Sequence, residues 1–390
     1  MTSFVAQMAR PLRGQRRPGD ASPRRILVIL DDCDASDALR ARFCLQALRR
    51  AYADAEIVLL VAKRAAAAVE RAGFHDRLVV SLIYTGRGSS KARMRIRRLI
   101  EAIRLVRHLG RDYDLVVTLG CGSTVLNLVG RLVGRKHVGY ANRFPWLLSG
   151  RPARYNFGSD PVDQNRALLR QLGIDGGEIA WTQLDDEHDV EAVERLLAQH
   201  RILPTTAVAV LHTGSDWACQ QWLPERWAAL GDWLVAHHGL VVVFTGLKRE
   251  GEFVESVQRT MRHASASVVG STDLHQLSAL IARASLCISV DSVTHDLALA
   301  TRTPSVILAG ASDSAREAVG RHVRVIDLKA PEAKLAISAS KQAKFVFRGC
   351  LNYECPLWGL REISVDQVRE AVDELLAAAR ETLALPTAQA

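Results

Sequence analysis

Short runs of apolar residues alternate along the chain with longer stretches in which apolar residues return every three or four positions. In the first half, these runs predict buried strands at 25–30, 56–61, 77–84 and 115–119, with an amphipathic helix at 38–51. The alternation weakens between 142 and 189, a region rich in Pro, Gly and Asp, and restarts at 207–211. Strands that alternate with helices indicate parallel sheets, so we predict an α/β protein with two Rossmann-like domains.

This pattern also gives the expected domain bounds. We expect a disordered basic leader at 1–24, an N-terminal domain at 25–180 and a C-terminal domain at 181–348. In the last segment, 349–390, an amphipathic helix at 364–383 is expected to pack back on the N-terminal domain. A chain of 390 residues, 48% of them apolar, is long enough to build two cores.

Hydropathy and cysteine usage indicate the compartment of the cell in which the protein is found. No apolar run approaches the length of a membrane span, and the first 25 residues lack the apolar stretch of a secretory signal. The seven cysteines are scattered, which fits a reducing cytoplasm. Cys350 and Cys355 have no second pair with which to bind a metal. We therefore expect a cytoplasmic protein that has no metal site and no cofactor.

The formal net charge of +9 arises partly from 87–111, where arginines crowd a predicted helix. One interpretation is a solvated helix face. The other is an acceptor-side basic patch, including Arg93, Arg97 and Arg98, that contacts phosphorylated lipid headgroups at the inner leaflet of a membrane. Nucleic acid is not an expected partner, because no aromatic residues interleave with the basic ones and no nucleic-acid motif occurs.

The segment after the predicted strand at 285–290 is the leading candidate for a ligand site. Asp291, Ser292, Thr294 and His295 stand between that strand and the next helix. Hydroxyls, free backbone N–H groups and the positive end of a helix dipole then meet beyond a parallel strand, where phosphate binds well. The alternatives are helix capping by Asp291 or Ser292 and a purely structural role for His295.

Two other turns carry similar residues. Thr213, Gly214 and Ser215 follow the strand at 207–211, and Thr245 and Gly246 follow the strand at 240–244. A glycine permits the backbone to approach a phosphate closely, although each turn also fits a plain connection. Among two-domain α/β proteins, periplasmic binding proteins are exported, and dehydrogenases need a Gly-rich first turn that 31–37 lack. The remaining class is the GT-B glycosyltransferases, whose two Rossmann-like domains face a central cleft.

Several motifs, in this order, resemble glycosyltransferase family 9, the ADP-heptose:lipopolysaccharide heptosyltransferases. They are RILVILDDCDASDALRAR, YDLVVTLGCGS, AVAVLHTGSDWACQQWLPERWAAL, VVFTG and VDSVTHDLALATRTPSV. The last is similar to the family pattern Asp-Ser-Gly-x-x-His-Leu-Ala-Ala-x-x-x-x-Pro. The chain departs from the family at Ser36, Leu247 and Val293, where glycine is expected, and at Gln220, where lysine is expected.

The resemblance implies a metal-independent, inverting GT-B enzyme in which Asp37 is the catalytic base; capping of the following helix is the alternative role. It also implies that the donor contacts Asp291, Ser292, Thr294 and His295 and the turns at 213–215 and 245–246, with Gln220 near its phosphates. Asp31, Asp32 and Asp34 are interpreted as a solvated acidic loop and not as a metal site.

The expected function is transfer of a heptose from ADP-heptose to lipopolysaccharide core or another cell-envelope glycan, by a cytoplasmic protein that can be peripheral on the inner membrane. Two alternatives stay open. One is a catalytically degenerate protein that acts as a binding or scaffold component of glycan assembly, which the replacements at Ser36, Gln220 and Val293 suggest. The other is a GT-B enzyme that uses a UDP- or GDP-sugar.

Overall fold

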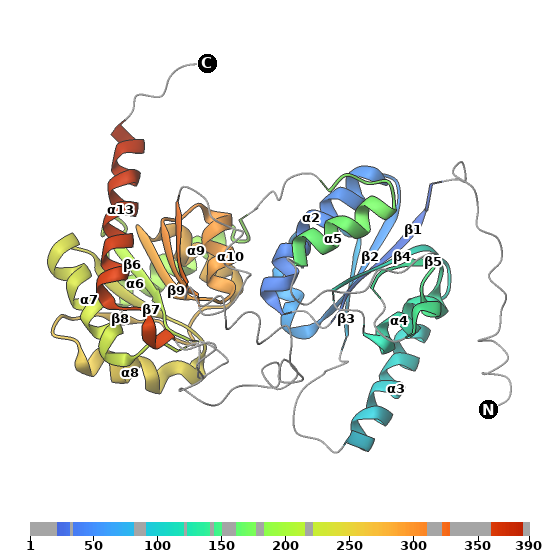
Figure 1. The fold of residues 1–390 in the computed structure, drawn as a ribbon, viewed down its shortest axis with the longest axis horizontal. Coiled ribbons are helices and arrows are strands. Elements are labelled where there is room, and N and C mark those ends of the chain that lie inside the picture. The colour runs from blue at the N-terminus through green and yellow to red at the C-terminus, as the bar shows by residue number, and fades with distance from the viewer. Residues whose placement is uncertain are drawn as a thin grey trace.

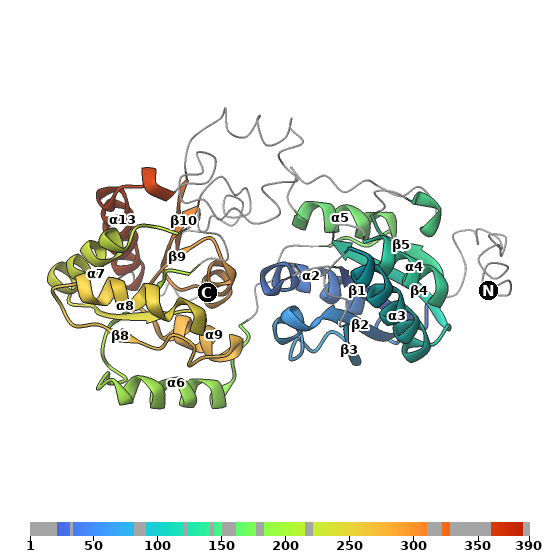
Figure 2. The same ribbon diagram turned by 90° about the horizontal axis from the view of Figure 1, so that it is seen from below.

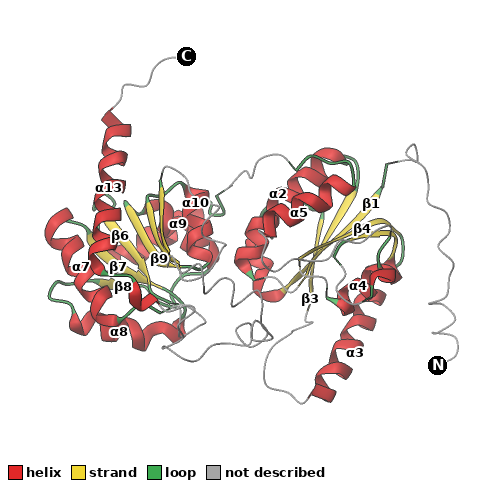
Figure 3. Cartoon of the chain, in the orientation of Figure 1, coloured by secondary structure: helices red, strands yellow, loops and turns green. Residues whose placement is uncertain are grey.

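The computed structural model describes residues 22–31, 34–81, 91–120, 123–140, 144–149, 161–176, 183–214, 221–309, 322–327 and 360–384. These residues form two α/β domains, each built around one sheet (Figures 1 and 3). The strand pairs of both sheets are parallel. The predicted fold class, two Rossmann-like domains with parallel sheets, is confirmed.

The N-terminal sheet has the strand order β3-β2-β1-β4-β5. Its strands are β1 (Arg25–Asp31), β2 (Glu56–Ala62), β3 (Arg77–Ser81), β4 (Tyr113–Gly120) and β5 (Gly134–Val138). One face is covered by α2 (Ala35–Ala51) and α5 (Pro161–Gln171), and the other by α3 (Lys91–Leu109) and α4 (Thr124–Val133) (Figure 2). The 3₁₀ helix η1 (Lys63–Ala68) follows β2, and η2 (Pro145–Leu147) follows β5.

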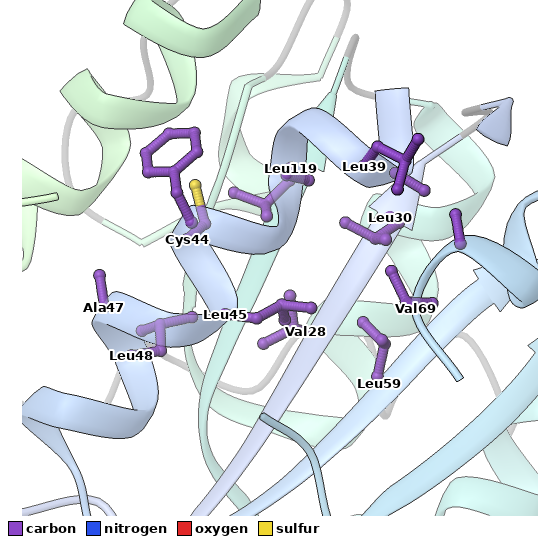
Figure 4. Packing of buried hydrophobic residues seen from close by; sticks show 14 of the residues in the cluster. Val28, Leu30, Leu39, Cys44, Leu45, Ala47, Leu48, Leu59, Val69 and Leu119 are labelled. Atoms are coloured by element: carbon purple, nitrogen blue, oxygen red, sulfur yellow. The ribbon is translucent and has the colours of Figure 1, made fainter. Parts of the chain in front are cut away.

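Strand β1 is buried on both faces because helices cover both sides of its sheet. Ile26, Val28 and Leu30 belong to the core under α2, and the residues between them belong to the core under α3 and α4. Figure 4 shows Leu45 of α2 close to Val28. A strand covered on both faces needs an unbroken apolar run, which explains the sequence RILVIL.

The C-terminal sheet has the strand order β11-β10-β9-β6-β7-β8. Its strands are β6 (Val208–His212), β7 (Val241–Thr245), β8 (Ala266–Ser267), β9 (Leu286–Val290), β10 (Ser305–Ala309) and β11 (Val323–Asp327). On one face lie α7 (Pro224–His238) and α8 (Gly251–Thr260), the latter preceded by η4 (Lys248–Glu250). On the other lie α6 (Glu187–Gln199), α9 (Leu274–Arg283) and α10 (Val293–Thr301).

The last helix, α13 (Val365–Ala384), packs on the C-terminal domain, after the 3₁₀ helix η5 (Leu360–Glu362). Val368, Val372 and Leu375 share a core with α7 and the C-terminal sheet, and Figure 1 shows α13 beside α7. The expectation that this helix packs on the N-terminal domain is therefore wrong for the described residues. Its apolar stripe requires an apolar partner but does not specify which sheet supplies it.

Two tryptophans connect α7 to this C-terminal segment. Trp222 and Trp227 are fully buried, and their ring centroids lie 5.1 Å apart in an edge-to-face arrangement. The indole N–H of Trp222 donates to the carbonyl of Ile363 at 2.8 Å. Both rings therefore belong to the core, and their burial keeps η5 and α13 against the C-terminal domain.

The two domains meet through α2 and η1 on one side and α9 and α10 on the other (Figure 1). The apolar cluster under α2 extends across this boundary to Leu297 and Ala298 of α10. Arg71, just after η1, pairs with Asp189 of α6 at 2.6 Å. Apolar and charged contacts thus fix one domain against the other. In the part of the chain that the structure describes, no helix has both the length and the apolar character to cross a bilayer.

Candidate active site

Each sheet reverses its strand order at one point, and open α/β sheets bind ligands beyond the carboxyl ends of the strands at that point. In the N-terminal sheet the point lies between β1 and β4, where Asp31 is in register with Gly120. In the C-terminal sheet it lies between β6 and β9, where His212 is in register with Ser289. A ligand site shared by the two domains is expected at these two strand ends.

The predicted residues lie directly beyond these strand ends. Asp37 is in the first turn of α2, after β1; Thr213 follows β6, and Asp291 follows β9. The charge of Arg40 on α2 connects the two groups. Burial opposes that charge, but the carboxylates of Asp296, Asp291 and Asp37 outweigh burial and raise the pKa of Arg40 above its usual value. The structure therefore brings carboxylates of both domains around one guanidinium.

Asp37 takes part in capping α2, although it is not the N-cap. The helix begins at Ala35, and the carboxylate of its N-cap, Asp34, accepts the N–H of Asp37 at 3.0 Å. The carboxylate of Asp37 in turn accepts the N–H of Asp34 at 3.4 Å. This reciprocal capping box fixes the carboxylate at the helix N-terminus. Capping and catalysis are compatible roles for Asp37.

The Asp37 side chain is exposed to solvent on one side, yet it binds its proton more tightly than a free aspartate. Desolvation by the surrounding helices raises its pKa to about 6; Asp34 and Asp296 act in the same direction, whereas Arg40 lowers the pKa. A carboxylate with this pKa is mostly ionised at pH 7 and accepts a proton more readily than an ordinary aspartate. Its electrostatics suit a general base.

Ser292 is the N-cap of α10, which confirms the capping role considered for it. Its Oγ accepts the N–H of Thr294 at 3.4 Å and lies 3.2 Å from Nδ1 of His212. Burial lowers the pKa of His212 to about 4. Its ring is therefore neutral at pH 7, and the 4.0 Å approach of Nε2 to Glu250 is not an ion pair.

Buried hydroxyls gather at the same strand ends. Among the described residues, the hydroxyl oxygens of Thr213, Thr245 and Ser289 have no hydrogen-bond partner, and the three residues are fully buried. Thr294, in the first turn of α10, has the same property. Buried hydroxyls normally form hydrogen bonds. This edge of the C-terminal sheet therefore combines hydroxyl donors with the N-terminus of α10, a combination that suits phosphate binding.

The imidazole of His295 is fully buried, and neither ring nitrogen has a partner within the described ranges. Burial lowers its pKa, so the ring is neutral at pH 7. Counted without a gap from Asp291, the histidine of Asp-Ser-Gly-x-x-His falls at position 296, which is aspartate in this chain. The family's histidine position therefore belongs to Asp296 in this chain. The donor contact expected of His295 stays a prediction.

Glu250 is a site residue that the sequence did not single out. Its carboxylate lies so close to both glycine turns that a Cβ at Gly214 or Gly246 would overlap it. The N–H of Leu247 donates to Oε2 of Glu250 at 2.9 Å, and the side chain is buried. Gly246 has a φ of 152°, which also favours glycine. The sequence feature that could have pointed to Glu250 is its position three residues after Leu247, which is the spacing of a capping box.

The structure does not describe the side chains of several other predicted residues. Ser215 and Gln220, together with Asp32, Cys350 and Cys355, fall outside the described residues. Arg93 and Arg97 belong to α3, but only their backbone is described, whereas Arg98 is half-buried. Their roles stay predictions. Within the described ranges, no group of three or more His, Cys, Asp or Glu side chains is placed to hold a metal ion.

Comparisons with known proteins identify relatives of this chain. A relative from Haemophilus influenzae, a lipopolysaccharide core heptosyltransferase named OpsX, is 27% identical over 164 residues, which are 41% of this chain and 45% of the relative. The match thus spans less than half of that relative.

Two solved structures share the fold at low identity. A family 9 glycosyltransferase from Veillonella parvula has a TM-score of 0.73 at 20% identity and covers 91% of this chain and 97% of its own. The Escherichia coli heptosyltransferase WaaC with ADP-2-deoxy-2-fluoro heptose has a TM-score of 0.61 at 16% identity and covers 90% of this chain and 99% of its own.

The family comparison spans both domains. The sequence model of glycosyltransferase family 9 (heptosyltransferase) matches residues 102–342, more than half of the chain. That range contains β4 and β5 of the N-terminal domain and the C-terminal sheet with its candidate phosphate site. The chain therefore belongs to glycosyltransferase family 9 and is a glycosyltransferase.

Proposed function

We propose that this protein transfers a heptose from ADP-heptose to lipopolysaccharide core or another cell-envelope glycan, with inversion at the anomeric carbon. The observation that carries the proposal is the contact between α2 and α10, where Arg40 donates to Asp296 at 2.9 Å and its charge also interacts with Asp37 of one domain and Asp291 of the other. The Haemophilus relative is named as a lipopolysaccharide core heptosyltransferase, and the WaaC structure is described as holding ADP-2-deoxy-2-fluoro heptose. Both support this choice of donor and acceptor.

Asp37 is proposed to act as the base. Its carboxylate takes the proton from the acceptor hydroxyl while the acceptor oxygen forms a bond to the anomeric carbon. The bond from that carbon to the diphosphate breaks on the opposite face, and the electron pair leaves with the nucleoside diphosphate. The hydroxyls of Ser292 and Thr213 and the N-terminus of α10 would stabilise the negative charge that develops there.

Other residues are proposed to orient the donor. Asp291 would accept hydrogen bonds from sugar hydroxyls, and Glu250, beside the two glycine turns, would accept them from the ribose. Thr294, His295, Thr245 and Gly246 belong to the same proposed site, as do Ser215 and Gln220, which lie outside the described residues. In this arrangement donor binding uses hydroxyls, carboxylates and a helix dipole.

A thermal-shift panel tests the donor. Purified protein is heated with ADP, UDP, GDP, CDP or ADP-heptose at millimolar concentration. A ligand at one hundred times its Kd stabilises the folded state by about 2.7 kcal/mol. We expect a selective rise in Tm with ADP and ADP-heptose. A selective shift with UDP or GDP would mean that the donor is a UDP- or GDP-sugar and not ADP-heptose. No shift with any nucleotide would favour a scaffold role.

Helix α3 is the proposed contact with the surface that carries the acceptor. Leu99, Ile100 and Ile103 are exposed on it, beside the exposed Arg104 and Arg107. Figure 1 shows α3 extending beyond the N-terminal sheet. Apolar side chains next to arginines suit the interface of an anionic bilayer, and Arg93, Arg97 and Arg98 on the same helix would add to the attraction.

This surface can be tested with phosphatidylglycerol vesicles. Arg104→Gln should weaken co-sedimentation roughly fivefold, because one basic residue near an anionic surface contributes about 1 kcal/mol. Ile100→Ser should weaken it by removing apolar contact. The control is Arg195→Gln, an exposed arginine on α6 of the other domain. Equal losses in the control and in Arg104→Gln would contradict a specific role for α3.

A further inference from the structure

A buried ion pair joins the two domains. Arg40 of α2 donates from Nε to Oδ1 of Asp296 at 2.9 Å and from a terminal nitrogen to Oδ2 at 3.4 Å. The hydroxyl of Ser36 also donates to Oδ2. The side chains of Arg40 and Asp296 are 10% and 0% exposed. Charges removed from water to this extent require close, well-directed partners, so the pair holds α2 and α10 in one relative position.

The pair lies next to the proposed base. Arg40 follows Asp37 by three residues, so the two side chains share one face of α2. The charged groups around Asp37 are its helix's N-cap Asp34, Arg40 on α2 and Asp296 on α10. The carboxylate of Asp291 and the neutral ring of His295 lie beside the ion pair. A change in either partner therefore alters both the separation of the domains and the field at Asp37.

The pair also depends on a residue that the family pattern does not contain. The pattern has histidine at the position of Asp296, and a neutral imidazole would not neutralise a buried guanidinium. Ser36, which replaces a glycine of the pattern, supplies the third hydrogen bond to the same carboxylate. Two departures from the family thus meet at one interdomain contact.

We propose that Arg40 and Asp296 are positioning residues, which hold the two domains together so that Asp37 stands opposite the donor site of the C-terminal domain. The inference rests on the proposed transfer reaction for its consequence, but the contact itself can be tested without turnover. Ser36 directs the Asp296 carboxylate, and Arg40 acts on Asp37 through its charge and through the position of α2.

The test measures the ionisation of Asp37 directly. Protein labelled with ¹³Cγ-aspartate is titrated by NMR, and the Asp37 signal is assigned with Asp37→Asn. Arg40→Gln removes a positive charge and should move the Asp37 titration to higher pH. Asp296→Asn removes a negative charge and should move it to lower pH. A charge within about 4–6 Å of a carboxylate shifts its pKa by about 1 or more. The double variant should titrate near the wild type, because the two effects oppose each other.

Arg71→Gln is the matched control. Arg71 also joins the domains, through Asp189 at 2.6 Å, but it is not among the charges that act on Asp37. This variant should leave the Asp37 titration unchanged. If Arg40→Gln does not fold, Arg40→Lys keeps the charge and loses the directed pair of hydrogen bonds. It should leave the titration near the wild-type pH while lowering kcat more than it raises KM.

Two results would overturn the inference: titrations that move in the same direction in Arg40→Gln and Asp296→Asn, or an Arg40→Lys variant with the wild-type kcat. Small-angle scattering adds a readout of domain separation, since Arg40→Gln should broaden the interdomain distribution. If the wild type shows no sugar transfer, the proposed function fails, while the NMR and scattering results still decide whether the ion pair positions Asp37.

Discussion

Asp37→Asn is expected to reduce the rate of sugar transfer by roughly 10²–10⁴-fold, the contribution of a positioned general base. Asparagine has nearly the shape of aspartate, and its oxygen still accepts the N–H of Asp34, so the capping box and the start of α2 are retained. What it loses is the capacity to take a proton from the acceptor hydroxyl. The measurement is turnover at saturating donor, together with the ADP-induced rise in Tm, which should equal that of the wild type.

The control is Asp163→Asn. Asp163 is also in the first turn of a helix in the N-terminal domain, and its side chain is 65% exposed. This variant should transfer sugar at the wild-type rate. If Asp37→Asn does so too, Asp37 is not the base. The wild-type pH profile gives an independent check: with a pKa of about 6, kcat/KM should fall about tenfold for each pH unit below 6.

The sequence predicts strands well where their side chains are buried on both faces. The run RILVIL reads as a buried strand because both faces of β1 are covered, and its alternating side chains enter two different cores. The turns after β6 and β9 are also recognisable, because Thr213-Gly214 and Asp291-Ser292 are chemically unlike the strands that precede them. Local chemistry is sufficient for these features.

Contacts between distant residues are not visible in the same way. Arg40 and Asp296 are 256 positions apart, and each looks like an ordinary charged residue of an amphipathic helix. The start of α2 depends on which of two aspartates caps it, and the reciprocal bonds select Asp34. The apolar stripe of α13 could pack on either sheet, and only the structure shows Val368 and Val372 in the core of the C-terminal domain. Each of these features is decided by tertiary packing.

Gly214→Ala should destabilise the protein and weaken donor binding. The added Cβ would overlap the buried carboxylate of Glu250, which is held by the N–H of Leu247. Overpacking of this kind costs about 1–3 kcal/mol. A carboxylate displaced from its place would also disturb the proposed ribose contact. The measurements are the apparent Tm and the ADP-induced shift, and both should fall below their wild-type values.

Glu250→Ala separates the two effects, because it removes the group that the new methyl would strike. In the double variant with Gly214→Ala, the loss of stability should be smaller than the sum of the single losses, whereas the ADP-induced shift should stay low. Gly251→Ala is the control: its Cβ has open space, and alanine is the better helix residue, so stability should be unchanged or higher. Additive losses in the double variant would mean that the cost of Gly214→Ala does not come from overlap with the Glu250 carboxylate.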